Sequence, residues 1–296
     1  MIPFVETPSL PLGPLTLHVF GFAVAVAVLV GFAIARRRFM RFELTPEIGE
    51  RMATWLLVGG FLGAHLFAVL FYFPGAVADD PWLLLRVWEP ISSFGAMIGG
   101  LAGAGLYLRC RASHLDRHQR WAYLDVAAFV FPFSLALGRV GCALVHDHPG
   151  GTTGFPLAVS LRSEAARTFI MNVYVSAGQA DLLPARSTWA ALGFHDLGLY
   201  EMVYLAVVVL PVLVWIDRKR RASGFFLCAF IALYMPVRFG LDFLRLNDAR
   251  YAGLTPAQWV ALCALILLPF LWMRVSKRRP AAPGEAHTPT TAEAAA

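Results

Sequence analysis

Seven apolar stretches recur along this 296-residue chain, most of them about as long as a helix that crosses a lipid bilayer. Crossing the hydrocarbon core takes roughly 20 helical residues. Because 58% of the residues are hydrophobic and only 15% are charged, the chain is too apolar for a soluble globular protein of this size. The sequence therefore predicts an all-α, polytopic membrane protein. Its seven transmembrane helices are expected at about 14–35, 53–73, 93–108, 122–145, 197–216, 224–244 and 256–273.

The third stretch is the shortest, and it is rich in glycine. Its glycines are Gly95, Gly99, Gly100, Gly103 and Gly105. Small residues at this density allow two helix backbones to approach closely, although they also occur in re-entrant segments. Either arrangement fits the sequence better than a plain lipid-facing helix.

The basic residues predict the orientation. Sixteen of them lie in four short segments, 36–41, 109–120, 218–221 and 274–279. Seven alternating spans would place all four segments on one side, which the positive-inside rule makes cytoplasmic. We therefore expect a multi-pass protein of the cell inner (cytoplasmic) membrane, with its N-terminus outside and its C-terminus in the cytoplasm. The net charge of +6 then reflects topology and attraction to anionic membrane lipids, and nucleic acid is not an expected partner.

The predicted domain organisation is one membrane domain, residues 1–279, followed by a disordered cytoplasmic tail, residues 280–296. The tail is rich in Pro, Ala and Thr and contains no aromatic residue. Residues 149–196 form the one long connection outside the apolar stretches. They include the β-branched patch 172–175 and are expected to form a small extracytoplasmic head segment.

A first group of polar residues lies at the outer end of the fourth stretch. An ionisable group at bilayer depth costs about 2.5–3.5 kcal/mol, so such groups usually mark functional cavities. Arg139 stands between two glycines and could grip a phosphate or a carboxylate with its planar guanidinium. His146, Asp147 and His148 follow, and they could supply a base, a proton relay or metal ligands, or simply cap the helix end. The four cysteines are scattered and the sequence contains no other compact His or Cys cluster, so no metal site is predicted.

A second group lies on the sixth stretch. Arg238, Asp242 and Arg245 are four and three residues apart, which would place them on one face of a helix. Asp242 could then pair with either arginine and leave a surplus positive charge that suits an anionic lipid head group. A purely structural stripe of ion pairs is the alternative.

A third group opens the fifth stretch. It consists of His195, Tyr200 and Glu201, and two further histidines, His18 and His65, lie in the first and second stretches. Tyrosine is common at membrane interfaces, whereas a glutamate just inside a span is not. The two isolated histidines are somewhat more typical of structural positions.

Together, these residues resemble the prolipoprotein diacylglyceryl transferase family over about residues 11–275. The resemblance is carried by six short motifs in the same order and at similar spacing. They are Leu-His-Val-Phe-Gly at 17–21, Phe-Tyr at 71–72, Ser-Phe-Gly-Ala-Met-Ile-Gly-Gly at 93–100, Gly-Arg-Val-Gly at 138–141, Leu-Tyr-Glu at 199–201, and Arg-Phe-Gly-Leu-Asp-Phe-Leu-Arg at 238–245 with Gly-Leu-Thr at 253–255.

The resemblance implies a seven-span enzyme that moves the diacylglyceryl group of phosphatidylglycerol onto the lipobox cysteine thiol of a prolipoprotein and releases glycerol phosphate. Its partners would be phosphatidylglycerol and the prolipoprotein signal peptide, and it would use no metal or organic cofactor. Arg139 and Arg238 would clamp the phosphate, and Asp242 would orient Arg238 and Arg245. The other residues expected to contact substrate are Tyr200, Glu201, His195 and His18.

The chain departs from the family pattern at three single positions and in the His-Pro-Ser-Gln-Leu-Tyr-Glu motif, which survives only as His195, Leu199, Tyr200 and Glu201. Phe94 stands where the family has a histidine within His-Gly-Gly, Cys142 replaces an asparagine, and Asp147 replaces a glutamate. Because phenylalanine cannot transfer a proton, the base is expected at His146, Asp147 or His148. Two alternatives remain open. One is an enzyme of the same fold that acts on another phospholipid head group or acceptor, and the other is a non-catalytic protein that binds or transports anionic lipids.

Overall fold

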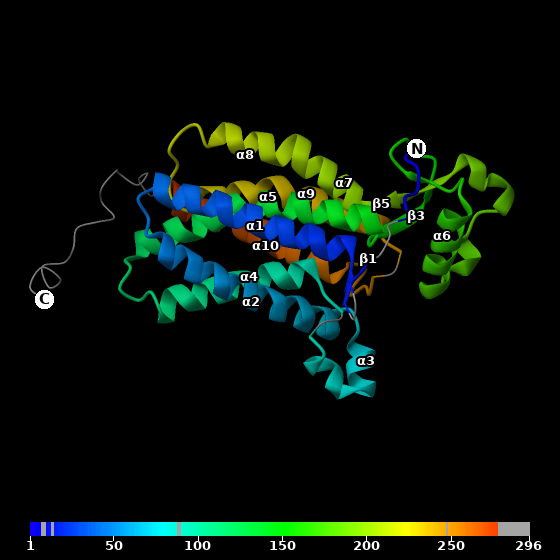
Figure 1. The fold of residues 1–296 in the computed structure, drawn as a ribbon, viewed down its shortest axis with the longest axis horizontal. Coiled ribbons are helices and arrows are strands. Elements are labelled where there is room, and N and C mark those ends of the chain that lie inside the picture. Colours follow the sequence, from blue (N-terminus) through cyan, green and yellow to red (C-terminus); the bar gives the residue numbers. More distant parts are fainter. Residues whose placement is uncertain (7–9, 13–14, 88–89, 247, 278–296) are drawn as a thin grey trace, which may run out of the picture. The chain divides into compact units, whose positions relative to one another are not determined.

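The computed structural model describes residues 1–6, 10–12, 15–87, 90–246 and 248–277, and most of these residues are helical (Figure 1). Within them, six helices are long and apolar enough to cross a membrane, so the chain is a multi-pass membrane protein. The predicted tail at 280–296 lies outside the described residues. The six are α1 (Val19–Arg41), α2 (Pro46–Phe71), α5 (Arg117–Val145), the continuous Leu197–Ile216, Phe225–Leu244, and α10 (Pro256–Ser276).

Two of the six contain a change of helix type. Leu197–Ile216 consists of α7 (Leu197–Tyr204), a π-helical turn (Leu205–Val209) and α8 (Leu210–Ile216). Phe225–Leu244 consists of α9 (Phe225–Leu241) and the 3-10 turn that follows it (Asp242–Leu244).

The glycine-rich third stretch forms α4 (Ser93–Cys110), a regular helix that packs closely against α2 (Figure 1). A Cβ atom on Gly63 would lie 2.6 Å from the carbonyl oxygen of Gly95, and one on Gly59 would lie 2.5 Å from that of Gly99. The glycines therefore serve close helix packing, one of the two arrangements predicted. Because α4 is not among the six membrane-length helices, the count of seven spans stays a prediction.

The chain divides into two compact units. Unit 1 comprises Met1–Val30, Pro132–Val212 and Leu233–Leu262. Unit 2 comprises Gly31–Phe131, Leu213–Ala232 and the described residues after Leu262. The long helices α1, α5, α9 and α10 each contribute residues to both units, and every predicted site residue belongs to unit 1.

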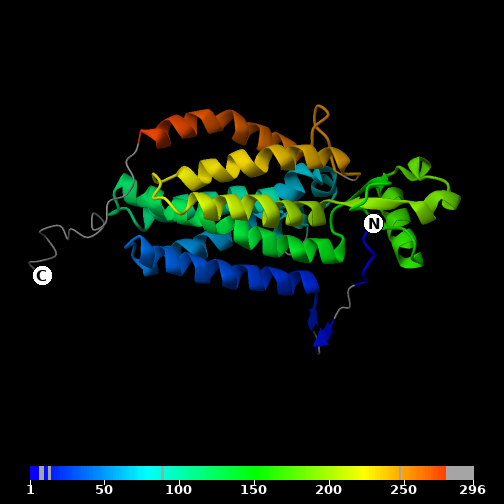
Figure 2. The same ribbon diagram turned by 90° about the horizontal axis from the view of Figure 1, so that it is seen from above.

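Unit 1 contains a small three-stranded antiparallel sheet in the order β3-β5-β4. The strands are β3 (Pro149–Thr153), β4 (Val159–Ser160) and β5 (Gly193–Asp196), and α6 (Glu164–Ser176) packs beside them (Figures 1 and 2). Their shared core is made of Val159, Leu161, Ala166, Ile170, Tyr174, Trp189 and Phe194. Residues 149–196 thus fold as a packed segment, in which the β-branched patch 172–175 lies in α6.

A second pair of strands, β1 (Leu10–Leu12) and β2 (Leu15–Leu17), precedes α1. The all-α prediction is therefore right for most of the described chain and wrong for the five short strands β1 to β5. Strands of two to five residues show too few alternations to be distinguished from loops by hydrophobic period.

In unit 2, α2 is followed by two short helical pieces, α3 (Pro74–Asp79) and a 3-10 helix (Pro81–Leu85). The buried side chain of His65, in α2, contacts the segment that follows this helix. Its Nδ1 lies 3.1 Å from the carbonyl oxygen of Pro90, and its Nε2 lies 3.0 Å from that of Leu83. His65 therefore has a structural position, the more typical one for an isolated histidine.

Candidate functional site

Two buried arginines in unit 1 converge on one glutamate. Arg139 on α5 and Arg238 on α9 each place their Nε beside Glu201 on α7, at 2.9 Å from Oε2 and 3.2 Å from Oε1 respectively. All three side chains are at most 3% exposed. The fold thus brings together both arginines of the expected phosphate clamp, and Glu201 bridges them.

A second layer of hydrogen bonds fixes this group. The Tyr234 hydroxyl donates to Glu201 Oε2 at 2.6 Å, Arg238 Nη1 donates to Asp242 Oδ1, and the Thr255 hydroxyl donates to Asp242 Oδ2 at 2.6 Å. Thr255 also caps α10 from the position before it: Gln258 Oε1 accepts from the Thr255 N–H at 2.9 Å, and Thr255 Oγ1 accepts from the Gln258 N–H at 3.1 Å. We call Arg139, Glu201, Tyr234, Arg238, Asp242 and Thr255 the arginine site.

Sequence reasoning missed Tyr234 as a site residue and named Thr255 only within a motif. The available signal for Thr255 was the Thr-Pro-Ala-Gln pattern at 255–258, which is a capping box. Tyr234 carries no comparable local signal. Only its place on α9, one helical turn before Arg238, puts it beside the other residues.

Three donor nitrogens of the arginine site form no hydrogen bond to the described residues: Arg139 Nε and Arg238 Nε, which form ion pairs with Glu201, and Arg139 Nη2. Among the described residues, no hydrogen-bond acceptor satisfies the buried Nη2 of Arg139. A buried donor without a partner costs about 1–3 kcal/mol, so it usually serves a ligand or a water. An anionic oxygen placed at Arg139 would satisfy this donor without displacing Glu201.

Arg245 is not where the sequence placed it. Because α9 ends at Leu241 and a 3-10 turn follows, Arg245 has extended backbone and does not share a helical face with Arg238 and Asp242. Its Nη1 pairs with Asp248 Oδ2 at 2.8 Å. Burial raises the pKa of Asp248, and the nearby Arg245 opposes that rise.

The predicted surplus of positive charge is also wrong for the described residues. The three arginines at 139, 238 and 245 are accompanied by three carboxylates at 201, 242 and 248. Asp242 contacts Arg238 through its side chain, whereas its contact with Arg245 is a backbone hydrogen bond, Arg245 N–H to Asp242 O at 3.3 Å.

His146 is held in a buried pair. It follows the last turn of α5 with a left-handed backbone (φ 52°), and its Nδ1 lies 2.7 Å from Asp196 Oδ2. Its ring stacks on Phe4 with 4.5 Å between centroids. Asp196 also caps α7 by accepting from the Leu199 N–H at 3.0 Å. His146 therefore fixes the turn between α5 and β3, and we assign it a positioning role.

The turn at His146 brings the next two residues back toward α5. The Cys142 Sγ, a carboxylate oxygen of Asp147 and a ring nitrogen of His148 all lie within 4.8 Å of one another. We call these three residues the Cys-Asp-His cluster. Cys142 lies four residues before His146 in the sequence, and the turn brings its sulfur beside Asp147 and His148.

This cluster lies next to two arginines. Arg139 Nη1 is 3.6 Å from Cys142 Sγ, and Arg245 Nη2 is 3.4 Å from His148 Nδ1. Burial lowers the pKa of His148 well below its ordinary value, and the positive charges of Arg245 and Arg139 act in the same direction. The His148 imidazole is therefore neutral at pH 7.

The remaining predicted residues are less closely connected. His195 Nδ1 and the Tyr200 hydroxyl are 3.0 Å apart, so these two form a pair of their own. Burial lowers the pKa of His195. His18 is exposed directly before α1, and the contacts described for the arginine site do not include it.

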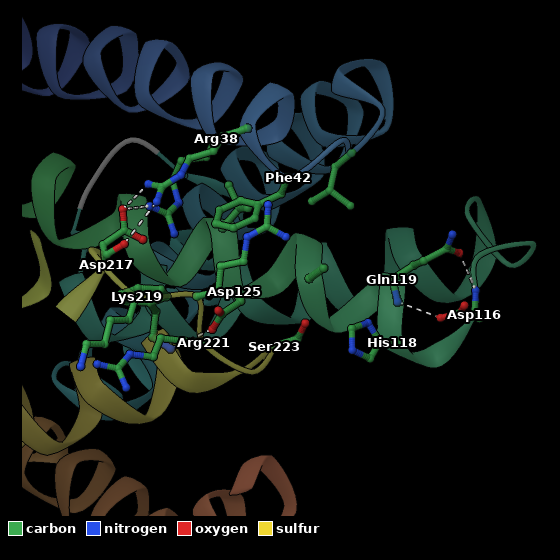
Figure 3. A pocket seen from close by; sticks show the side chains of 16 residues that line it. Arg38, Phe42, Asp116, His118, Gln119, Asp125, Asp217, Lys219, Arg221 and Ser223 are labelled. Carbon is green, nitrogen blue, oxygen red and sulfur yellow. Dashed lines mark hydrogen bonds and ion pairs between the residues drawn. The ribbon is translucent and has the colours of Figure 1, made fainter. Parts of the chain in front are cut away.

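Unit 2 has a cavity of about 400 Å³ that contains none of the predicted site residues (Figure 3). Arg38, Asp217, Lys219 and Arg221 lie around it, and Arg38 Nη1 pairs with Asp217 Oδ2 at 2.9 Å. Its basic residues belong to the segments that the sequence assigned to membrane orientation. The arginine site combines three contacts between buried arginines and buried carboxylates, and we take it as the candidate functional site.

Over most of its length the chain is similar to proteins of one family. The family model described as prolipoprotein diacylglyceryl transferase matches residues 9–274. A relative from Proteus mirabilis is 30% identical, with 98% of this chain and 97% of the relative covered. A relative from Chromohalobacter salexigens is 28% identical, with 90% and 89% covered. Both are named phosphatidylglycerol–prolipoprotein diacylglyceryl transferase.

Proposed function

The chain belongs to the prolipoprotein diacylglyceryl transferase family, and from that premise we propose that it transfers the diacylglyceryl group of phosphatidylglycerol to the lipobox cysteine thiol of a prolipoprotein. Glycerol phosphate is the leaving group. The observation that carries this proposal is the buried guanidinium of Arg139, whose Nη2 has no acceptor among the described residues. A phosphate oxygen of the lipid is the acceptor that this donor fits.

The arginine site suits the departure of a phosphate. Negative charge builds up on the phosphate oxygen as its bond to the diacylglyceryl carbon breaks, and donors fixed in advance stabilise that charge most effectively. Glu201 holds Arg139 and Arg238 in place, and Asp242, which accepts a hydrogen bond from Thr255, holds Arg238 from its other side. The guanidiniums therefore need little reorganisation during the reaction.

The acceptor thiol must lose its proton, because the thiolate is the nucleophile and an ordinary cysteine has a pKa of about 8.5. Phe94 offers no proton acceptor at the position where the family resemblance expects a histidine. We assign the deprotonation to the Cys-Asp-His cluster, which lies beside Arg139 and contains the neutral His148. This places thiol activation next to the phosphate clamp.

The proposal includes the membrane arrangement expected from the sequence. It has seven spans, with the N-terminus and residues 149–196 outside the cell membrane and the C-terminus in the cytoplasm. The four basic segments support it, because the positive-inside rule keeps such segments in the cytoplasm. Reporter fusions at residue 180 and at the C-terminus should report opposite sides, and fusions on the same side would overturn it.

The transfer reaction can be tested with purified protein in phosphatidylglycerol micelles and a lipobox peptide. We expect a diacylglyceryl peptide together with glycerol phosphate. A peptide with serine in place of cysteine should give neither, and Arg139→Lys should strongly reduce both. Folded protein that yields no product would overturn the proposal, and turnover of a different lipid in a head-group panel would redirect it to another substrate.

A further inference from the structure

We propose that the cavity of unit 2 binds a phosphate group, carried by the head group of an anionic phospholipid or by a soluble phosphate compound. None of its lining residues belongs to the arginine site, so it has no part in the proposed transfer. Its walls come from the end of α1, the beginning of α5 and the turn between α8 and α9 (Figure 3). On the proposed membrane arrangement, these parts lie at the cytoplasmic ends of the helices.

The size and lining of the cavity are those of a ligand site. Its volume of about 400 Å³ falls within the range of roughly 300–1,000 Å³ that small-molecule sites occupy. Phe42, Leu44, Val126 and Phe226 form the apolar part of the lining, and charged side chains form the rest. Such a mixed lining suits a ligand that has one charged group on a less polar body.

The charges around the cavity do not balance. Five of its lining residues are Lys or Arg and three are Asp, which leaves a surplus of two positive charges. They are Arg38, Arg41, Lys219, Arg220 and Arg221, and Asp116, Asp125 and Asp217. A phosphate monoester carries a charge of about −1.5 to −2 at pH 7, so a single one would balance the surplus.

Two of the three aspartates are engaged at helix N-termini. Asp116 Oδ1 accepts from the Gln119 N–H at 2.8 Å in the first turn of α5, and Asp125 Oδ1 accepts from the Phe226 N–H at 2.8 Å in the first turn of α9. The N-terminus of a helix carries a partial positive charge that compensates a nearby carboxylate. These two aspartates therefore do little to neutralise the basic residues.

The third aspartate serves two arginines at once. Asp217 Oδ2 lies 2.9 Å from Arg38 Nη1 and 2.7 Å from Arg41 Nη1. One carboxylate cannot neutralise two guanidiniums. Lys219 and Arg221 form no ion pair with a carboxylate in the described part of the chain, so their charges add to the uncompensated one.

Arg38 provides a buried donor at the wall of the cavity. It is 6% exposed, its guanidinium carbon lies 3.5 Å from the centre of the Phe129 ring, and its Nε has no hydrogen-bond acceptor among the described residues. Membrane orientation requires only that a basic residue stays on the cytoplasmic side, and it does not require burial. An unused buried donor calls for a ligand or a water. Because Nε is covered, a ligand oxygen would reach it after a small rotation of the guanidinium toward the cavity.

The surroundings favour a lipid as the source of the phosphate. Basic pockets between transmembrane helices on the cytoplasmic side bind phospholipid head groups. Here α1 and α5 are membrane-length helices, and α9 forms most of a third. A head group in the cavity would join the end of α1 to the turn between α8 and α9, whose basic residues otherwise repel one another. A soluble phosphate compound would reach the same residues from the cytoplasm.

The test measures how phosphatidic acid binds to the full-length protein in neutral detergent micelles at about 0.15 M salt, for example by native mass spectrometry. Lys219→Gln combined with Arg221→Gln removes two charges from the cavity and should weaken binding about 10–30-fold. Arg36→Gln combined with Arg37→Gln removes the same charge from α1 outside the cavity. It should weaken binding less than about threefold, because salt screens charges that do not contact the ligand. Neither pair touches the arginine site, so lipid bound there does not affect the comparison.

A second probe distinguishes the two sources. Phosphatidic acid binding that depends on Lys219 and Arg221 supports a lipid head group, and the same dependence seen only with inorganic phosphate supports a soluble compound. Equal weakening by the two double variants, or no saturable binding of either probe, overturns the site.

Transfer activity separates this site from the proposed function. The Lys219→Gln, Arg221→Gln protein should keep transfer within about twofold of wild type, because these residues lie outside the arginine site. Circular dichroism checks its fold independently of activity. A wild type that binds phosphatidic acid through the cavity but transfers nothing would reject the proposed function and leave the cavity site intact.

Discussion

The two units each contain a cluster of arginines and carboxylates, and the two clusters differ in their access to water. In the arginine site of unit 1, Arg139, Glu201, Arg238 and Asp242 are all at most 3% exposed. In unit 2, a single Asp217 serves both Arg38 and Arg41, and the Arg41 side chain is 51% exposed. That second cluster borders a cavity of about 400 Å³ (Figure 3).

The difference lies in how each cluster compensates its buried charges. Burying an ion pair costs several kcal/mol per charge, and its attraction repays that cost only when the hydrogen bonds are well satisfied. The arginine site meets this condition with Tyr234 and Thr255, yet it leaves Arg139 Nη2 unpaired. In unit 2, Arg38 is stabilised by the ring of Phe129, 3.5 Å from its guanidinium carbon. Its Nε, like Arg139 Nη2, has no hydrogen-bond partner among the described residues, so the two clusters differ in exposure and not in having an unused donor.

The largest expected effect is on the stability of the arginine site. Glu201→Gln keeps the shape of the side chain but leaves Arg139 facing no carboxylate, so the free energy of unfolding should fall by about 3–5 kcal/mol. Asp217→Asn is the matched change in unit 2 and should cost at most about half as much. Unfolding in mixed micelles measures both. Equal losses would show that water access does not separate the two clusters.

The next effect is on activity. Arg139→Lys retains the positive charge but loses the planar fork that serves Glu201 and the phosphate together. We expect transfer to fall by about 10²–10³-fold, as when one donor is removed from an oxyanion site, with the protein still folded. Arg41→Lys, the control in unit 2, should change transfer by no more than about twofold. A full rate in Arg139→Lys would remove Arg139 from the phosphate clamp.

The sequence pointed to Arg139 and Arg238 because a charge in an apolar stretch needs an explanation, and the structure brings these two arginines together at Glu201. The sequence also located the spans well, since 197–216 coincides with a membrane-length helix and 224–244 differs by one residue. It did not predict the partners. Glu201, the bridge between Arg139 and Arg238, lies far from both in the chain, and no local pattern specifies such a contact.

Two predictions about Arg238, Asp242 and Arg245 were wrong, the shared helical face and the surplus positive charge. The first has a simple cause. The spacing of Arg238, Asp242 and Arg245 was evaluated on an uninterrupted helix, but α9 ends at Leu241. The left-handed turn at His146 was hidden for a similar reason, because only the fold, through Asp196 and Phe4, makes that backbone favourable. Helix ends and long-range pairs are therefore what sequence reasoning could not supply.

A smaller effect concerns the hydrogen bond between Thr255 and Asp242. Thr255→Val removes the hydroxyl that donates to Asp242 at 2.6 Å and the cap of α10, and we expect a loss of about 2 kcal/mol in the free energy of unfolding. Thr54→Val in unit 2 removes an exposed hydroxyl that donates to the Glu50 carbonyl oxygen, so it should cost less than about 0.5 kcal/mol. Similar costs at the two positions would mean that Asp242 does not depend on Thr255.

The smallest effect is at Arg41. An exposed ion pair contributes about 0.2–1 kcal/mol and is screened by salt. Arg41→Ala should therefore lower the free energy of unfolding by less than about 1 kcal/mol in dilute buffer and by almost nothing at 1 M salt. The loss caused by Glu201→Gln should persist at high salt, because ions do not reach a pair that is at most 2% exposed. Measuring both variants across a salt series compares the clusters directly, and a salt-sensitive Glu201→Gln would show that water enters the arginine site.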